Sequence, residues 1–155
     1  MAEIPRAILY ADSMPAGHYA VLHPGASQPD KTWPADRFLA VAGHLKRDFC
    51  LEPIFIGAHG DRLSRFRAFR TLAGAPLATI KSLLERAMLF LGNDSGPAHM
   101  AAAFGVPVIV MFGSSDPVIW GPWRTPSEIL THLTGIASVA VDDVLASLNR
   151  MRVHV

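Results

Sequence analysis

The sequence contains a single cysteine, Cys50, so no disulfide can form within the chain, and a reducing compartment fits this composition. Charged residues make up 17% of the chain and the net charge is +1, which provides no bulk attraction to nucleic acid or to an anionic membrane. No apolar run approaches the ~20 residues of a membrane-spanning helix, and the first residues lack the features of a signal peptide. We therefore expect a cytoplasmic protein with no transmembrane segment and no nucleic-acid partner.

Several motifs of catalytic and metal sites are also missing. None of the seven histidines forms an H-E-x-x-H pair, and one cysteine cannot build a cysteine zinc cage. The chain has no Walker A loop and no G-x-G-x-x-G after a strand. The run from Asn93 to Pro97 is not a nucleophile elbow, because these two residues occupy the required glycine positions. We expect neither a metal nor a cofactor.

The sequence does contain alternating strand and helix patterns. Half of the 155 residues are hydrophobic, which is enough for one globular domain with a real core. Short apolar runs bounded by glycine or proline predict buried strands, and apolar residues at helical spacing predict the segments between them. The predicted strands cover 19–22, 53–56, 88–91, 108–112 and 128–132, and the predicted helices cover 34–47, 61–72, 80–86, 97–104 and 141–151.

This alternation predicts an α/β fold with a doubly wound, Rossmann-like parallel sheet. We interpret residues 1–18, which hold Pro5, Pro15 and Gly17, as a linker or arm, and residues 19–155 as the domain. Arginines are concentrated in the segment 62–70. We predict that they form a solvated helix face, and the alternative is a patch that faces lipid or a partner.

The centre of this pattern is the segment 87–113, which we interpret as strand, polar loop, short helix and strand. Pro97 suits a first helical turn, Asp94 or Ser95 can cap that start, and Gly105 can end the helix in a left-handed conformation. A polar loop at the carboxyl end of a parallel strand is a usual ligand site, and a helix N-terminus favours a phosphate. The alternative is a helix cap with no ligand.

Two stretches resemble a known family. Gly92 to Pro107, followed by Phe-Gly-Ser-Ser-Asp-Pro and Trp-Gly-Pro, and Val21 to Pro34 are similar to the C-terminal half of glycosyltransferase family 9, the lipopolysaccharide heptosyltransferases. The resemblance covers about residues 19–150. It implies the donor-binding half of an inverting transferase of glycosyltransferase B-type architecture. Its donor would be an ADP-sugar, of the ADP-heptose kind, and its acceptor a glycan or lipid-linked glycan of lipopolysaccharide or a related polymer.

The same resemblance implies that the general base is an aspartate on an N-terminal domain that this chain does not contain. We therefore expect the chain alone to bind the donor without turnover. We expect the full-length protein to be cytoplasmic, peripheral at the inner membrane.

By resemblance, the donor contacts Asp94, Ser95 and Gly96, and His99 lines its pocket. Lys31 would pair with the donor phosphates and stabilise charge on the departing nucleoside diphosphate, and Ser27 would help to bind those phosphates. Each residue also has a plain structural interpretation. Lys31 can be an exposed loop lysine, and His99 can be a packed helix residue.

The sequence departs from the family pattern in two places. Members commonly have an acidic residue after the second strand, where this chain has His59, Gly60 and Asp61. His59 or Asp61 can substitute for it, or Asp61 can simply cap a helix. Residues 75–80 also look too short for the strand and loop expected before the next helix. Asp116 and Trp120, after the last core strand, could shape the cleft.

These departures leave two alternatives open. The first is a truncated or degenerate relative that acts as a non-catalytic nucleotide-binding or protein-interaction domain. The second is a different nucleotide-sugar enzyme with the same architecture, such as an epimerase.

Overall fold

The protein is represented by a computed structural model, which describes residues 15, 17–25, 32–58, 63–93, 95–112, 126–132 and 135–151. Strands and helices alternate along most of these residues, as the sequence predicts. The strands are β1 (Tyr19–His23), β2 (Glu52–Gly57), β3 (Arg70–Ala73), β4 (Leu89–Asn93), β5 (Val108–Met111) and β6 (Ser127–Leu130). The helices are α2 (Ala35–Asp48), α3 (Leu77–Glu85), α4 (Gly96–Ala103) and α6 (Val141–Met151), with 3-10 turns η2 (Ser64–Phe66) and η3 (Ile136–Ser138).

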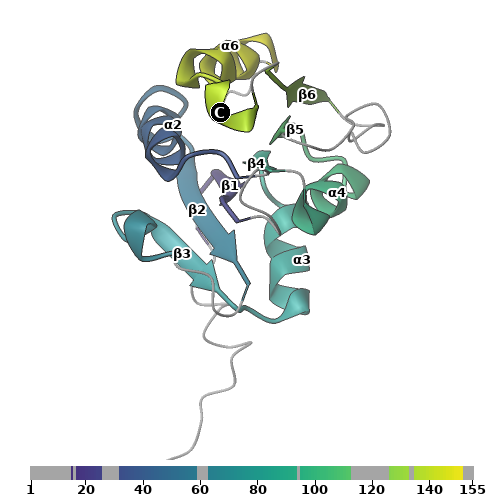
Figure 1. The fold of residues 1–155 in the computed structure, drawn as a ribbon. Helices are drawn as coiled ribbons and strands as arrows, with labels where there is room; N and C mark the ends of the chain where they lie inside the picture. The colour runs from purple at the N-terminus through teal and green to yellow at the C-terminus, as the bar shows by residue number, and fades with distance from the viewer. Residues whose placement is uncertain are drawn as a thin grey trace, which may run out of the picture.

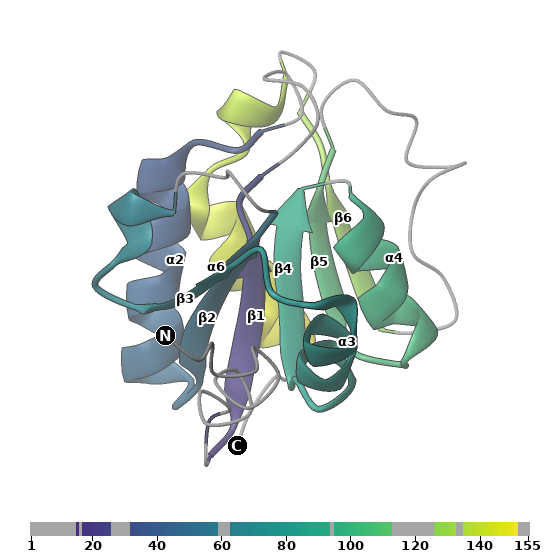
Figure 2. The same cartoon turned by 90° about the horizontal axis from the view of Figure 1, so that it is seen from below.

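The six strands form one parallel sheet with the order β3-β2-β1-β4-β5-β6. The chain builds outward from β1 to β3, then returns to the middle and builds outward again from β4 to β6 (Figures 1 and 2). This is the strand order of a doubly wound Rossmann-like sheet, so the predicted fold class is confirmed.

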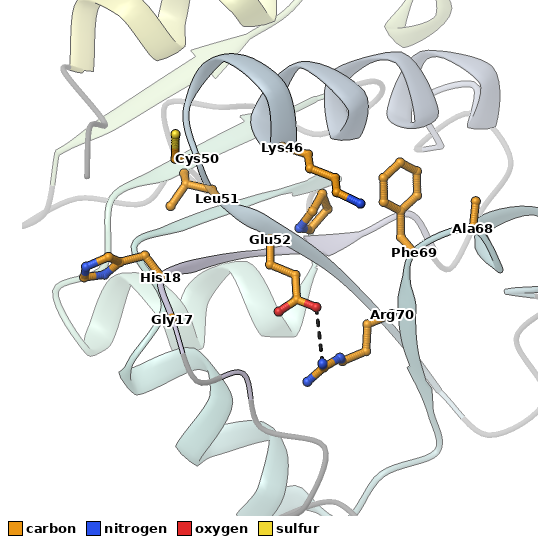
Figure 3. A pocket seen from close by; sticks show the side chains of 10 residues that line it. Gly17, His18, Lys46, Cys50, Leu51, Glu52, Ala68, Phe69 and Arg70 are labelled. Atoms are coloured by element: carbon orange, nitrogen blue, oxygen red, sulfur yellow. Dashed lines mark ion pairs between the residues drawn. The ribbon is translucent and has the colours of Figure 1, made fainter.

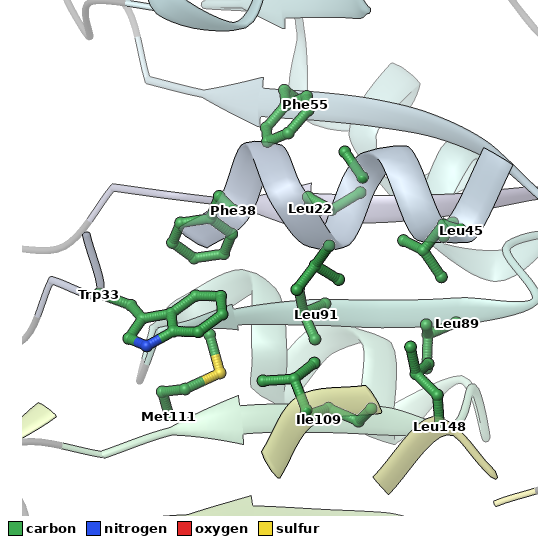
Figure 4. Close-up of a cluster of buried hydrophobic side chains, with 14 of the residues drawn as sticks. Leu22, Trp33, Phe38, Leu45, Phe55, Leu89, Leu91, Ile109, Met111 and Leu148 are labelled. Atoms are coloured by element: carbon green, nitrogen blue, oxygen red, sulfur yellow. The ribbon is translucent and has the colours of Figure 1, made fainter. Parts of the chain in front are cut away.

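Helices cover both faces of the sheet, as a parallel sheet requires. α2 and α6 pack on one face, where the cluster includes Trp33, Phe38 and Leu148 (Figure 4). α3 and α4 pack on the other face, against Val21 and Phe90 among others. Burying each large apolar side chain contributes about 1.5–3 kcal/mol, so these two layers supply most of the driving force for folding.

The central helix α4 follows the sequence prediction. Pro97 lies in its first turn, and Gly105, with φ of 79°, ends it in the left-handed region. Its Ala98, Ala101 and Ala102 are buried against the sheet. Small side chains here let the helix approach the strands closely. The last helix, Val141–Met151, has the predicted bounds.

The helix predicted over residues 61–72 is wrong. The structure has the short turn η2 and then β3, in which Thr71 pairs with Phe55 in the register of the sheet. Phe66, within the range of that predicted helix, stacks on Phe55 of the sheet with a centroid distance of 4.2 Å. Packing on the sheet therefore overrides the helical spacing of the apolar residues.

The arginines of this segment do not form a helix face either. Arg65 pairs with Asp36 of α2, and Arg70 lies 3.3 Å from the Glu52 carboxylate. Both pairs link this segment to neighbouring elements and are partly exposed. Their contribution to stability is therefore small, about 0–1 kcal/mol each.

Residues 75–80 are not a truncated strand and loop. The strand expected there is β3, which comes earlier, and the left-handed Gly74 (φ 67°) turns the chain and donates its N–H to the Gly57 carbonyl at 2.9 Å. Helix α3 then begins at Leu77, three residues before the predicted start. The predicted arm, residues 1–18, lies outside the described residues except for Pro15, Gly17 and His18.

Tyr19 ties β1 to α3. Its side chain is buried, and the phenol donates a hydrogen bond to the Leu83 carbonyl at 2.5 Å. Burial raises the pKa of the Tyr19 phenol to about 12, and the positive charge of Arg86 opposes the shift only in part.

The folded-state pKa of Tyr19 lies above its unfolded value near 10. The contribution of the neutral phenol to the free energy of unfolding should therefore be complete below pH ~10 and should disappear as the pH rises toward 12. Urea unfolding of the wild type and Tyr19→Phe at several pH values from 8 upward measures this. Over that pH range, we expect the free energy of unfolding to fall by up to about 3 kcal/mol more in the wild type than in the variant. Parallel pH profiles would contradict the assignment.

Candidate functional site

The candidate site lies where the strand order reverses, between β1 and β4. These strands are neighbours, paired from Ala20 with Leu89 to His23 with Gly92. After β1 the chain crosses to the face covered by α2, and after β4 it crosses to the face covered by α4. The two connections therefore diverge at the carboxyl ends of the strands, and open α/β sheets bind ligands in a crevice at this place.

Gly92 allows the two strands to come together at this point. A Cβ placed on Gly92 would lie 2.9 Å from the His23 carbonyl oxygen and 3.1 Å from the Phe90 ring. A larger residue would push β1 and β4 apart at the base of the crevice. The glycine is therefore explained by close strand approach.

The N-terminus of α4 faces this crevice. Ser95 is the N-cap residue, but its side chain makes no capping hydrogen bond. Its Oγ is buried and has no partner among the residues that the structure describes. Gly96 is exposed, and a Cβ there would meet no atom within 4 Å. The first turn thus has open space beside it, an unused hydroxyl and the positive end of the helix dipole.

The structure brings together three of the predicted site residues, Ser95, Gly96 and His99, at the first turn of α4. His99 is partly buried, and its backbone N–H donates to the Ser95 carbonyl at 3.4 Å. The other predicted residues lie outside the described residues: Ser27, Lys31, His59, Asp61, Asp94, Asp116 and Trp120.

The buried side chain of Asn93 was not among the predicted site residues. It ends β4, and its Nδ2 donates to the Pro24 carbonyl at 2.8 Å. Its Oδ1 accepts from the backbone N–H of Trp33 at 2.9 Å. The polar end of an otherwise apolar strand was the only signal in the sequence, and it did not reveal these partners.

Trp33 is itself anchored on its other side. Its indole Nε1 donates to the Val139 carbonyl at 2.8 Å, and Arg37 donates to the same oxygen at 2.7 Å. The Trp33 ring is fully buried and meets Phe38 edge-on at 5.0 Å. The start of α2 is therefore fixed both to the end of β4 and to the segment before α6.

An apolar pocket of about 450 Å³ lies at the same edge of the sheet. This volume falls within the range of about 300–1,000 Å³ that is usual for small-ligand sites. The wall combines the ends of β1 and β2, the turn after β3, and the starts of α3 and α4. It includes His23, Gly57, Ala75, Leu77, Ile80 and Pro97.

A second pocket, of about 510 Å³, lies at the opposite, amino-terminal edge of the strands (Figure 3). Its walls include Lys46 and Cys50, and the ion pair between Glu52 and Arg70 lies within it. Of the predicted site residues that the structure describes, Ser95, Gly96 and His99, none lines this pocket. Pro97, in the first turn of α4, lines the 450 Å³ pocket instead.

The described residues contain no group of three or more histidine, cysteine, aspartate or glutamate side chains placed to hold a metal ion. In the same ranges, no helix has the length and apolar character needed to cross a membrane.

Comparison with known proteins identifies the relatives of this chain. The sequence model of glycosyltransferase family 9 (heptosyltransferase) matches residues 6–141. Lipopolysaccharide heptosyltransferase 3 of Escherichia coli K12 is 34% identical over 116 residues, which cover 68% of this chain and 34% of the relative. This chain thus spans about a third of that relative's length.

Solved structures match the whole fold. E. coli ADP-heptose lipopolysaccharide heptosyltransferase II superposes with a TM-score of 0.79 at 21% identity, covering 97% of this chain and 52% of that one. E. coli heptosyltransferase WaaC with ADP superposes with a TM-score of 0.79 at 19% identity, and the match covers 94% of this chain and 48% of WaaC. TibC of enterotoxigenic E. coli is described as an iron-containing dodecameric glycosyltransferase. It superposes with a TM-score of 0.73 at 19% identity, and the match covers 90% of this chain and 48% of TibC.

The sequence match, and not the fold alone, separates this chain from epimerases and transferases of another family, because an epimerase structure also superposes on it with a TM-score of 0.53. The fold agrees with heptosyltransferase structures over nearly its full length, and the family match extends over most of the sequence. The chain belongs to glycosyltransferase family 9, the heptosyltransferase family.

Proposed function

We propose that the crevice between β1 and β4 binds the nucleoside diphosphate of an ADP-sugar donor, of the ADP-heptose kind. In this proposal the chain is the C-terminal, donor-binding part of an inverting glycosyltransferase. The acceptor is a glycan or lipid-linked glycan of lipopolysaccharide or a related polymer. The proposal keeps the cytoplasmic location expected from the family resemblance.

One observation carries the proposal: the anion-favouring helix start and the apolar pocket are continuous. Pro97 lies in the first turn of α4 and is also part of the wall of the 450 Å³ pocket. A nucleotide needs these two environments side by side, because its phosphates seek N–H donors and its base seeks apolar contact. The unused Ser95 hydroxyl supplies a further donor at that junction.

We assign the phosphates to the first turn of α4 and to Ser27 and Lys31. In the sequence, both residues lie between Gly25 and Thr32, in the connection that leaves the carboxyl end of β1. A lysine ammonium near the diphosphate would stabilise the charge that develops on the leaving group. Asp94, Gly96 and His99 would complete the donor contacts. His59 or Asp61 would hold donor hydroxyls, and Asp116 and Trp120 would shape the cleft.

We assign the base to the apolar pocket. Leu77, which is 59% exposed, and Ile80 offer apolar surface at the start of α3. The relatives support adenine as the base, because WaaC was solved with ADP and TibC was solved in complex with ADP-D-beta-D-heptose.

The proposed transfer needs a second domain. The acceptor hydroxyl oxygen would attack the anomeric carbon of the donor, the bond to the diphosphate would break, and ADP would leave with the electron pair. The acceptor proton must pass to a general base. By family resemblance that base is an aspartate of an N-terminal domain.

The alternative of a degenerate, non-catalytic relative loses one of its two supports. Residues 75–80, which looked too short, in fact form the turn and the helix start that line the pocket. The other support, the missing acidic residue near His59, concerns residues outside the described ranges.

Lys31→Ala tests the phosphate assignment. Loss of one charge-assisted contact should weaken ADP binding by roughly 10- to 100-fold. Calorimetric titration with ADP and UDP measures this, and we expect the wild type to prefer ADP. Lys46→Ala is the matched control, because Lys46 lies at the opposite edge of the sheet. Equal affinities for both variants, or a wild type that binds no ADP at millimolar concentration, would contradict the proposal.

Leu77→Ser tests the base assignment. Removing this exposed apolar wall should leave stability within about 0.5 kcal/mol and weaken ADP binding several-fold, to roughly tenfold. Binding of inorganic pyrophosphate, which has no base, should not change. Phe104→Ser is the control, because Phe104 is also partly exposed (39%) but does not line the pocket. An unchanged ADP affinity in Leu77→Ser would reject the pocket as the base site.

The need for a second domain predicts that the 155-residue chain alone binds the donor without transferring sugar. Release of ADP from ADP-heptose, followed in the presence of a lipopolysaccharide-core acceptor, measures transfer. We expect a rate no higher than that of the buffer. A catalytic rate that Lys31→Ala abolishes would contradict the requirement for a base outside this chain.

A further inference from the structure

Asn93 stands out among the buried residues. It is one of two polar side chains that are fully buried in the described ranges, and the other is Ser147 of α6. Burying an amide stabilises a fold only when its hydrogen bonds are made, and an apolar residue at the end of a strand would avoid that risk. We therefore expect the two hydrogen bonds of Asn93 to have a role that an apolar residue could not fill.

Both hydrogen bonds of Asn93 go to the main chain, on either side of a single loop. Pro24, whose carbonyl accepts from Nδ2 at 2.8 Å, precedes the segment 25–32. Trp33, whose N–H donates to Oδ1 at 2.9 Å, follows it. One side chain thus holds the neck of the segment that carries Ser27 and Lys31 in the sequence.

The chemistry of the two partners requires an amide. A carbonyl can only accept and a backbone N–H can only donate, so the side chain between them must offer one donor and one acceptor at a fixed separation. An ionised aspartate has no donor for Pro24, and a serine is too short to reach both groups at once.

The anchors of this neck are rigid. Pro24 directly follows β1, whose last residue His23 is paired with Gly92 of β4. Trp33 is fixed by its bond to the Val139 carbonyl and by full burial of its ring. Asn93 is also directly followed in the chain by Asp94 and Ser95. The same residue therefore sets the spacing between the loop after β1 and the first turn of α4.

We propose that Asn93 is a positioning residue for the donor diphosphate. It holds Pro24 and Trp33, which flank in the sequence the segment that bears Ser27 and Lys31, at a fixed distance from the start of α4, and it does not contact the donor itself. This inference rests on the proposed function. Small misplacements of binding groups are costly, so breaking one of the two bonds should reduce affinity even in a chain that remains folded.

The test compares ADP affinity in the wild type, Asn93→Asp and Ser147→Ala by calorimetry from pH 5 to pH 8. At pH 8 the aspartate is charged and cannot donate to Pro24, so we expect the dissociation constant to rise about tenfold. At pH 5 protonation of the buried carboxyl restores a donor, so the ratio of variant to wild type should return toward one. Taking this ratio removes the titration of ADP itself.

Ser147→Ala is the matched control, because Ser147 is equally buried but lies on α6 and accepts a hydrogen bond from Arg150 at 2.9 Å. The ratio of its ADP dissociation constant to that of the wild type should stay at one from pH 5 to pH 8. Thermal melts establish that each variant is folded. If Asn93→Asp does not fold, Asn93→Ser replaces it, and it should weaken binding equally at every pH because it has no group that titrates.

The outcomes separate the two levels of the proposal. A wild type that does not bind ADP rejects the proposed function and this inference together. A wild type that binds ADP, with variants of Asn93 that bind equally well, rejects the positioning role alone. A loss in Asn93→Asp that is the same at all pH values, or that Ser147→Ala shares, indicates general destabilisation and also rejects the positioning role.

Discussion

The reversal of strand order between β1 and β4 is the constraint on which the rest of the structure depends. Parallel strands need crossover connections, so the chain must leave each strand at its carboxyl end and travel over one face of the sheet. Because α2 and α4 lie on opposite faces, the connections after β1 and β4 separate at once. The crevice follows from topology, and Gly92 and Asn93 keep its base closed and its two sides in register.

Much of this architecture could be predicted from the sequence because burial on both faces leaves a simple signal. The apolar runs at Tyr19–Leu22 and Val108–Phe112 are too short for helices and are bounded by turn residues, and the structure has strands there. The prediction for residues 61–72 was wrong because the apolar residues there fit the spacing of a helix as well as they fit a turn followed by a strand. Only contact with Phe55, which is remote in sequence, decides that Phe66 stacks on the sheet and that β3 follows.

The local structure of the candidate site could be predicted only in part. The helix start at Ser95 and Gly96 could be recognised because local sequence determines it, and the structure places His99 beside it. The role of Asn93 depends on partners 60 and 69 residues away, so no spacing along the chain reveals it. The apolar pocket has the same origin, because its walls come from four separate elements and their linking turns.

The central claim is that a nucleoside diphosphate binds at the carboxyl ends of β1 and β4. The most direct measurement is a two-dimensional 15N–1H NMR titration of the chain with ADP. The proposal predicts that the backbone amides of Ser95, Gly96, Ala98 and His99 and those of residues 57–58 shift together and saturate with one dissociation constant, while those of residues 50–52, at the opposite pocket, stay unchanged. Shifts confined to residues 50–52, or none at millimolar ADP, would contradict it.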